Sequence, residues 1–336
     1  MRRRPRTEVG RPSPSQGNRT NLSVYSRAMT LLAPQLFLSA ILLVLNKEDG
    51  TLAMIDADSG KVTGTAKTGE GPHELAISKD GRYAFVTNYG SRTPGSTLSV
   101  IDLQEKSGKL VDISPLGRPH GITVGPDGNV YFTAEANKVV GRLDPASGKV
   151  DEQYSTGQTG THMVVFTPDG ARMITTNIGS DSVSILKHGT EPVHIQAGKG
   201  PEGLDISPNG RELWVANSRG GSITVIDLVK NEATSTFDIG SNRSNRLKFS
   251  ADGRLVLVSD MEGGQVIVVD APGRKVLKRV DVGRQPEGIL VPPGGSRAFV
   301  AVTGANQVAI FDLKKLEVVG HLDTGGRGPD GMAWVK

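Results

Sequence analysis

Short apolar runs separated by polar turn residues recur along most of the chain. In residues 71–90, GPHELAISKDGRYAFVTNYG, one run covers residues 73–78 and a second covers residues 83–88, with Asp80-Gly81 between them. Apolar runs of this length around an Asp-Gly pair are typical of two β-strands joined by a tight turn. The pattern therefore predicts a β-hairpin as the local building unit.

Variants of this hairpin begin at seven places along the chain. Their starts lie 40 to 47 residues apart, at positions 72, 119, 161, 201, 244, 286 and 329. Each hairpin is associated with two further apolar runs, such as TLSVID and the segment beginning near Lys109 in the first repeat. A period of about 40 to 50 residues built only from short strands is typical of a four-stranded β-propeller blade. The sequence predicts an all-β, seven-bladed β-propeller.

The two ends of the repeat region complement each other. The region enters at a second strand, residues 42–46, and leaves on a first strand, residues 331–335. Pairing of the carboxyl-terminal strand with the amino-terminal strands would complete one blade and remove exposed sheet edges. We therefore expect this pairing to close the ring.

The first 40 residues differ in composition from the rest. Residues 1–28 hold seven Arg and one Glu, and the uncharged run MTLLAPQLFLSA follows at residues 29–40. Basic residues, an apolar run and a small residue are the order of a secretory signal. We predict a disordered basic tail and a signal peptide in residues 1–40, and one propeller domain over residues 41–336. The mature protein would be periplasmic or secreted, without a stable membrane span. The alternative is that the apolar run only leads into the first strand.

Charge and composition exclude several function classes. The net charge is +4, but residues 1–28 contribute +6, so the rest of the chain carries −2. A near-neutral body with its basic residues in a tail makes nucleic acid an unexpected partner. The chain has no Cys, which excludes disulfides and thiol catalysis. Neither a phosphate-binding glycine loop before a helix nor a serine nucleophile elbow occurs.

Polar residues recur where each first strand begins and each second strand ends. Three of the six histidines, His73, His120 and His162, hold the same repeat position in consecutive blades. Because antiparallel strands reverse at each turn, both places open on one face of the ring. We expect these residues to surround one mouth of the central channel: His73, His120, Glu135, His162, Glu202, Asn217, Asn245, Asp260, Glu287 and Asp330.

Imidazoles beside carboxylates are ligands that a divalent metal such as zinc accepts. His73, His120 and His162 are therefore candidate metal ligands. If the protein is an enzyme, His120 and Glu135 are the candidate catalytic residues. The alternative is structural: the polar residue bonds the Asn that ends the second strand and so ties each blade to its neighbour.

Basic residues precede several of these positions, and they would attract an anionic ligand or an acidic protein partner. The alternative is a solvated rim that is partly neutralised by nearby carboxylates. The candidate ligand-binding residues are Arg118, Glu202, Asn217, Arg246, Asp260, Arg284, Glu287 and Asp330.

Two segments, AFVTNYG at residues 84–90 and LWVANSRGGSITVIDL at residues 213–228, resemble the YVTN-family β-propeller repeats. This resemblance covers nearly everything from Leu42 onward. It implies a propeller of the kind found in exported bacterial proteins.

Two further segments resemble enzymes with this fold. Residues 117–145 are similar to blades of streptogramin lyases, which open a cyclic ester with a metal at the channel mouth, and His120 and Glu135 match that blade. Residues 160–183 are similar to a blade of lactonase-type propellers, in which His162 is the matching residue. Two functions follow as expectations: a binding module that holds a ligand or protein at the channel mouth, or a metal-assisted lyase or lactonase.

Overall fold

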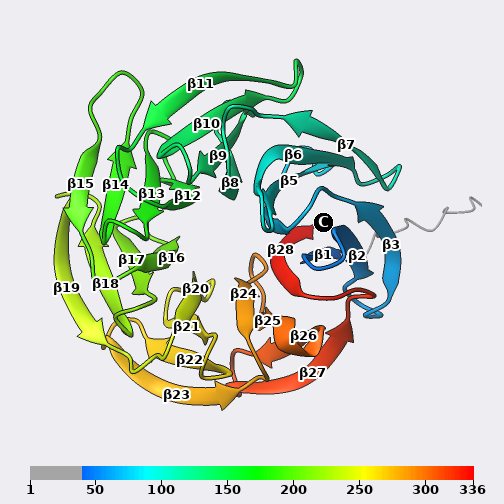
Figure 1. Cartoon of the computed structure of the whole chain (residues 1–336). Helices are drawn as coiled ribbons and strands as arrows, with labels where there is room; N and C mark the ends of the chain where they lie inside the picture. The colour runs from blue at the N-terminus through cyan, green and yellow to red at the C-terminus, as the bar shows by residue number, and fades with distance from the viewer. Residues whose placement is uncertain (1–39) are drawn as a thin grey trace, which may run out of the picture. The chain divides into compact units, whose positions relative to one another are not determined.

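The computed structural model describes residues 40–336. These residues form seven four-stranded antiparallel sheets arranged around a central axis, as Figure 1 shows. The prediction of an all-β, seven-bladed propeller is confirmed. The predictions made for residues 1–39 lie outside the described residues.

In every blade the strands follow one another from the channel outward. The blade that closes the ring consists of β28 (Pro329–Val335), β1 (Ile41–Asn46), β2 (Thr51–Asp56) and β3 (Val62–Lys67). The second consists of β4 (Pro72–Ile77), β5 (Tyr83–Gly90), β6 (Pro94–Asp102) and β7 (Ser107–Asp112). The third consists of β8 (Pro119–Val124), β9 (Val130–Ala134), β10 (Val139–Asp144) and β11 (Lys149–Ser155). The fourth consists of β12 (Thr161–Phe166), β13 (Met173–Asn177), β14 (Ser182–Leu186) and β15 (Val193–Gln196).

The remaining three blades have the same order. The fifth consists of β16 (Pro201–Ile206), β17 (Glu212–Asn217), β18 (Ser222–Asp227) and β19 (Glu232–Asp238). The sixth consists of β20 (Ser244–Phe249), β21 (Leu255–Asp260), β22 (Gln265–Asp270) and β23 (Lys275–Asp281). The seventh consists of β24 (Pro286–Leu290), β25 (Arg297–Val302), β26 (Gln307–Asp312) and β27 (Glu317–Asp323), with the 3₁₀ turn η1 (Thr303–Ala305) between β25 and β26.

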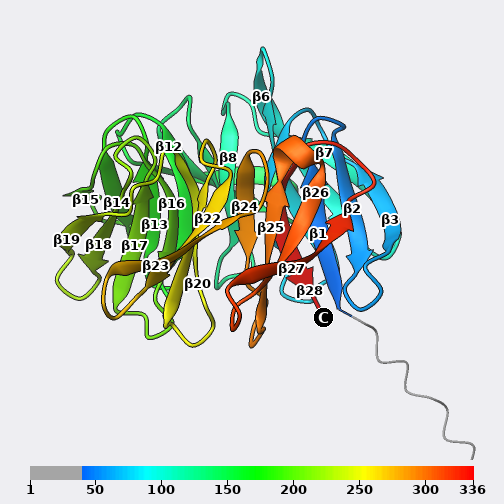
Figure 2. The same cartoon turned by 90° about the horizontal axis from the view of Figure 1, so that it is seen from below.

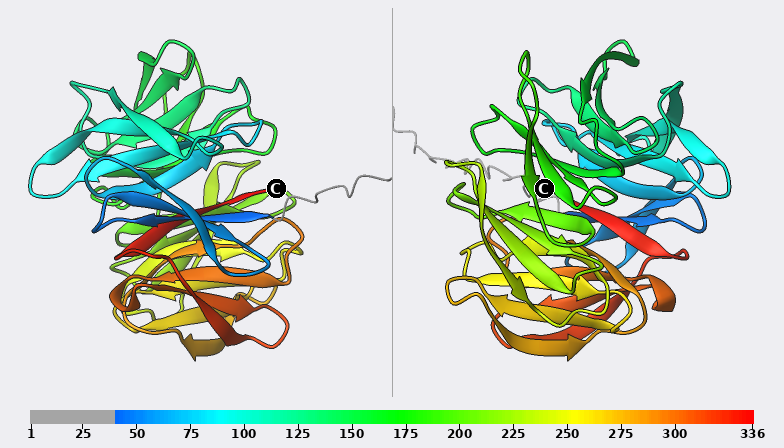
Figure 3. Two further views of the ribbon diagram at one scale, coloured as in Figure 1. Left: turned by 90° about the vertical axis from the view of Figure 1, so that its right-hand side faces the viewer. Right: turned by 60° about the vertical axis from the view of Figure 1, so that its left-hand side comes forward.

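The ring closes through the carboxyl-terminal strand, as expected. β28 pairs antiparallel with β1, with Leu42 opposite Trp334 and Val44 opposite Met332. Figure 3 shows the two strands side by side. The Trp334 ring also stacks on Phe299 of the neighbouring blade at 5.7 Å between centroids. The last strand therefore completes one sheet and packs against a second.

The core lies between adjacent blades. For example, Leu257 and Val268 of the sixth blade pack with Val300 and Phe311 of the seventh, and all four are buried. Alternate residues of each strand face opposite sides, so every middle strand contributes apolar side chains to two such layers. Figure 2 shows the strands from the side, with the β5–β6 hairpin extending beyond its neighbours.

Hydroxyl groups fix the inner strand of one blade to the second strand of the preceding blade. The Thr87 hydroxyl donates to the His120 carbonyl at 2.7 Å, and the Thr133 hydroxyl donates to the His162 carbonyl at 2.6 Å. Thr176 and Ser259 make the same bond to Glu202 and Glu287, at 2.9 and 2.7 Å. These bonds hold the inner strands, and hence the channel residues, in place.

A β-bulge near the start of each inner strand determines which side chains enter the channel. In the second blade Pro72 pairs with Asn88 and Leu75 with Val86, which leaves His73 and Glu74 between the two pairs. The same register shift occurs in the other six blades. Bulges redirect side chains and are common near functional sites.

Helical structure is almost absent from residues 40–336. No helix in this part of the chain is long and apolar enough to cross a membrane.

Candidate functional site

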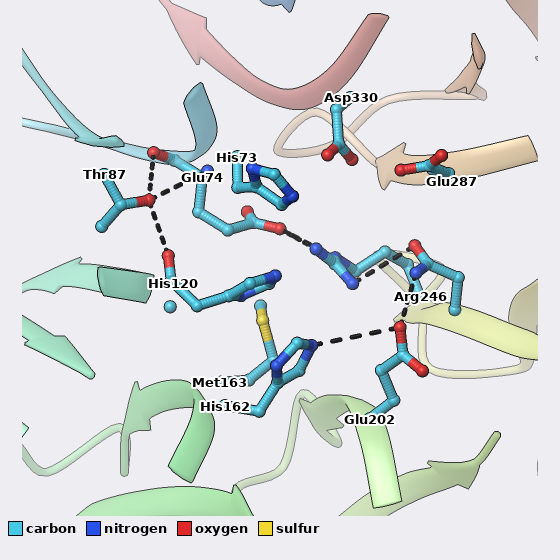
Figure 4. A network of polar contacts seen from close by, with 12 residues as sticks. His73, Glu74, Thr87, His120, His162, Met163, Glu202, Arg246, Glu287 and Asp330 are labelled. Carbon is cyan, nitrogen blue, oxygen red and sulfur yellow. Dashed lines mark hydrogen bonds and ion pairs between the residues drawn. The ribbon is translucent and has the colours of Figure 1, made fainter. Parts of the chain in front are cut away.

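The candidate site is the channel mouth, where the seven inner strands begin (Figure 4). We call the second residue of each inner strand channel position 1 and the third channel position 2. Channel position 1 holds a polar residue in every blade: His73, His120, His162, Glu202, Asn245, Glu287 and Asp330. Most of them are buried, with 5% of His120 and 1% of Asp330 exposed. The repeat therefore gathers residues that are up to 257 positions apart in the chain.

The three histidines of channel position 1 lie together. The ring centroids of His73 and His120 are 5.2 Å apart, and the rings of His120 and His162 stack at 3.7 Å. Burial lowers the pKa of His73 and of His120. The neighbouring imidazoles of His162 and His73 lower the pKa of His120 further. Near neutral pH, His73 and His120 are therefore neutral imidazoles that can both donate and accept hydrogen bonds.

His162 and Glu135 form a dyad. His162 Nδ1 lies 2.5 Å from Glu135 Oε1, and the Tyr89 hydroxyl donates to Glu135 Oε2 at 2.7 Å. Burial opposes ionisation of Glu135, but its bonds to His162 and Tyr89 outweigh burial and lower its pKa. The carboxylate therefore directs the Nδ1 proton of His162 toward itself. Nε2 is buried, has no hydrogen-bond partner among residues 40–336, and lies 4.0 Å from Glu202 Oε1.

An ion pair crosses the channel from β20 to β4. Arg246 Nε donates to Glu74 Oε1 at 2.8 Å, and Arg246 Nη2 makes a second bond to the same oxygen. Arg246 Nη1 donates to Asn245 Oδ1 at 3.2 Å, and Asn245 Nδ2 donates to Glu202 Oε1 at 2.6 Å. Only 7% of the Arg246 side chain and 15% of the Glu74 side chain are exposed. The network fixes the guanidinium group inside the channel.

A second charged cluster lies where the ring closes. Lys47 follows β1, and its Nζ lies 2.5 Å from Glu287 Oε2 and 3.5 Å from Asp330 Oδ2. Burial raises the pKa of the Glu287 carboxyl to about 7, and the neighbouring Asp330 carboxylate adds to this effect. Burial also opposes ionisation of Asp330, but Lys47, His73 and Arg246 lower the pKa of Asp330. Glu287 is therefore the carboxyl of this pair that holds a proton more readily.

Some residues predicted for the mouth have other roles. The Asn217 amide donates to Ser222 and Thr224, and Asp260 accepts the backbone N–H of Asn242 and of Arg243. These two side chains therefore fix loops and third strands. Glu135 was expected to end its second strand opposite His120, but this strand ends one residue earlier, at Ala134. Ala134 pairs with Pro119 as Asn88 pairs with Pro72, so Glu135 corresponds to Tyr89.

The two rim arginines lie outside the channel. Arg118 covers the Tyr89 ring, with the guanidinium carbon 4.8 Å from the ring centroid, and it donates to the Ser91 carbonyl. Arg284 donates to the Gly304 carbonyl and lines, together with Arg243, a groove of about 700 Å³ between the sixth and seventh blades. Both remain candidate ligand contacts at the rim.

In the structural alternative, the polar residue at channel position 1 bonds the Asn that ends the second strand. This predicted bond is wrong. Asn88 bonds Thr97 and Ser99 of the third strand, and Asn177 bonds the corresponding hydroxyls in its own blade. Ties between blades are made by the hydroxyls described above and, within the channel, by bonds such as those of His162 to Glu135 and of Asn245 to Glu202.

Sequence reasoning missed three channel residues, Lys47, Tyr89 and Met163, and it considered Glu74 only as a carboxylate that partly neutralises a solvated rim. Glu74 and Met163 occupy channel position 2, which is glycine in four of the seven blades. The sequence signal for Glu74 and Met163 was that they replace the glycine of the Pro-x-Gly pattern found in other repeats. Without the bulge, alternation would have placed these side chains on the opposite face of the strand.

The three histidines predicted as metal ligands have other contacts in this structure. The rings of His120 and His162 stack face to face, and His162 Nδ1 is bonded to Glu135. In the part of the chain that the structure describes, no group of three or more His, Asp or Glu side chains is arranged to hold a metal ion. The metal role of the three histidines stays a prediction, and no step proposed below depends on it.

Comparison with known proteins gives a family match. A family model described as the lactonase, seven-bladed β-propeller matches residues 38–336. No curated protein matches the chain. The resemblance to lactonase-type propellers is thus confirmed over nearly all of the repeat region.

Several solved structures share the fold. The periplasmic gluconolactonase PpgL of Pseudomonas aeruginosa is 21% identical, with a TM-score of 0.73 over 88% of this chain and 99% of that chain. The hydrazine synthase of Kuenenia stuttgartiensis is 18% identical, with a TM-score of 0.72 over 81% and 92%. A streptogramin B lyase is 16% identical, with a TM-score of 0.67 over 87% and 90%. At these identities the likeness establishes the fold alone.

Proposed function

The chain belongs to the lactonase family of seven-bladed β-propellers, and we propose that it hydrolyses a lactone, a cyclic ester, at the channel mouth. The observation that carries this proposal is the Glu135–His162 dyad. A buried imidazole whose Nδ1 is held by a carboxylate, and whose Nε2 faces a channel without a partner in residues 40–336, is arranged as a general base.

In the proposed reaction His162 Nε2 accepts a proton from a water molecule as the water oxygen attacks the lactone carbonyl carbon. Glu135 keeps the imidazole in the required tautomer and stabilises the imidazolium that forms. The carbon–oxygen bond of the ring then breaks, and the ring oxygen takes up a proton and becomes the hydroxyl of the product. His120, a neutral buried imidazole whose Nδ1 has no partner within the described residues, offers a hydrogen bond to a substrate hydroxyl.

The experiment that tests this function is hydrolysis of glucono-δ-lactone and δ-valerolactone, followed by acid release in a pH-stat. His162→Asn and Glu135→Gln should each lower kcat/KM by about 10²-fold or more, since general-base catalysis contributes about 10² to 10⁴.

The chain offers a matched control. His188 is an exposed histidine on the outer surface, and its Nδ1 lies 2.8 Å from Glu152 Oε1. His188→Asn removes a similar His–Glu pair far from the channel and should leave kcat/KM unchanged. Equal activity of His162→Asn and His188→Asn would refute the role of the dyad.

A second candidate function is binding without reaction. It is favoured by two buried atoms in the channel, His120 Nδ1 and Asp330 Oδ1, that lack hydrogen-bond partners within the described part of the chain and that a ligand would satisfy. Calorimetric binding of glucono-δ-lactone or gluconate, with no acid release, would support the binding module over the enzyme.

We also propose that the protein acts outside the cytoplasm. The proposal is supported by the order of basic and apolar residues before the first strand. One protein of similar fold, PpgL, is described as periplasmic.

A further inference from the structure

Lys47, Glu287 and Asp330 take no part in the reaction described above, yet they form a buried cluster in the same channel. Figure 4 shows Glu287 and Asp330 on the opposite side of the channel from His162. Only 6% of the Glu287 side chain and 1% of the Asp330 side chain are exposed. Burial of two adjacent carboxyl groups is costly and requires compensation.

The cluster has fewer positive charges than carboxyl groups. Lys47 contacts both carboxyls, and Arg246, another cation in the channel, is bonded to Glu74. The charged and titratable groups that influence the pair are Lys47 from the end of β1, Arg246 from β20 and His73 from β4. With a single ammonium group for two buried carboxyls, one carboxyl is most stable in its protonated form.

Asp330 gives independent evidence that the cluster has an unfilled hydrogen-bonding position. Its Oδ1 is fully buried and has no hydrogen-bond partner among residues 40–336, although its Oδ2 lies near Lys47. Unsatisfied buried oxygens are rare in folded proteins and call for a partner, such as a ligand group or a water molecule. The acidic cluster is therefore part of the ligand-binding channel rather than a closed structural ion pair.

We propose that Glu287 is the general acid of the lactone hydrolysis and that it donates its carboxyl proton to the ring oxygen as the carbon–oxygen bond breaks. This inference rests on the proposed lactonase function. The step balances: the water proton goes to His162, the Glu287 proton goes to the leaving oxygen, and the Glu287 carboxylate pairs with Lys47. The imidazolium then loses its proton to solvent, and Glu287 regains one.

Glu287 suits this role better than Asp330. The pKa of Glu287 is raised to about 7, whereas the pKa of Asp330 is lowered. A general acid works best when its pKa lies near the working pH, because it is then protonated and still transfers its proton readily.

The test uses two lactones that differ in their leaving group. When δ-valerolactone opens, the leaving group is an alkoxide, which needs a proton. When dihydrocoumarin opens, the leaving group is a phenolate, which needs a proton far less. Glu287→Gln should lower kcat/KM for δ-valerolactone by about 10²-fold and for dihydrocoumarin by less than about threefold. Glu287→Asp should recover part of the δ-valerolactone activity. His162→Asn should lower both, because water attack is common to both substrates.

The outcomes separate the two proposals. Equal loss on both lactones, or no loss on either, in Glu287→Gln would overturn the general-acid role and leave the lactonase function standing. A wild-type protein that opens neither lactone would overturn both. If Glu287→Gln does not fold, the wild type decides: kcat/KM for δ-valerolactone should fall above about pH 7, where Glu287 loses its proton, and this alkaline limb should be absent with dihydrocoumarin. The same limb with both substrates would refute the assignment.

Discussion

The protonation of Glu287 has a consequence for stability that can be measured without any substrate. The carboxyl has an ordinary pKa of 4.5, and burial beside Asp330 raises it to about 7 in the folded protein. Between these two values the folded protein binds more protons than the unfolded chain. The stabilisation that this group provides is therefore complete below about pH 4.5 and is lost as the pH rises to about 7. Each unit of pKa difference corresponds to about 1.4 kcal/mol, so the loss amounts to about 3 kcal/mol.

The Glu287→Gln variant isolates this contribution, because glutamine has a similar shape and does not titrate. We expect the free energy of unfolding of the wild type, measured relative to Glu287→Gln, to fall by about 3 kcal/mol from pH 4.5 to pH 8. For a domain of about 300 residues this corresponds to about 5 °C in relative Tm.

Urea unfolding followed by the fluorescence of Trp214 and Trp334 would measure the effect. Trp214 is buried in the core between the fifth and sixth blades, and Trp334 lies in the closing strand β28. A difference between the two proteins that stays constant with pH, or that increases with pH, would refute the assignment of a raised pKa to Glu287. Asp330→Asn provides a second check, because removal of the neighbouring carboxylate should reduce the pH dependence.

Two further predictions concern the cross-channel ion pair and the amino terminus. Arg246→Met leaves the Glu74 carboxylate without its cation and should lower the free energy of unfolding by about 3 kcal/mol. Addition of Glu74→Gln to this variant should restore at least half of the loss. A double variant no more stable than Arg246→Met would contradict the pairing. Expression of the full chain in a Gram-negative host should give a periplasmic protein whose amino-terminal sequence begins just after Ala40, and recovery of the intact chain in the cytoplasmic fraction would contradict the proposed export.

The fold could be predicted because it is set by the period of the sequence. Apolar runs around Asp-Gly or Asn-Gly turns define the strands, and a spacing of about 42 residues defines the blade. The closing pair of β1 and β28 also followed from the sequence, since the repeat region opens and closes with complementary parts of one blade. These features depend on local sequence patterns that recur in every repeat.

The site could be predicted only in part. Channel position 1 was recognisable because His73, His120 and His162 recur at the same place in consecutive repeats. Glu135 was also predicted for the mouth, but its bond to His162 was not recognisable, because such a contact depends on the register of the second strand. A shift of one residue separates Glu135, which enters the channel, from Ala134, which does not. The bond between Arg246 and Glu74 joins residues 172 positions apart, and no local pattern indicates such a contact.

The odd number of blades requires one break in the alternation of residues at channel position 2, and the acidic cluster lies at this break. At channel position 2 glycine alternates with a longer residue around the ring: Gly331, Glu74, Gly121, Met163, Gly203, Arg246 and Gly288. Each of these glycines packs against the inner strand of the next blade; a Cβ on Gly203, for example, would lie 2.6 Å from the Asn245 carbonyl oxygen. A strict alternation cannot close around seven blades, so Gly288 and Gly331 fall in adjacent blades. At this point no long side chain projects from channel position 2, and Lys47 reaches in from β1 to contact Glu287 and Asp330. The symmetry of the repeat thus fails at one place, and the failure leaves two buried carboxyls facing the channel there.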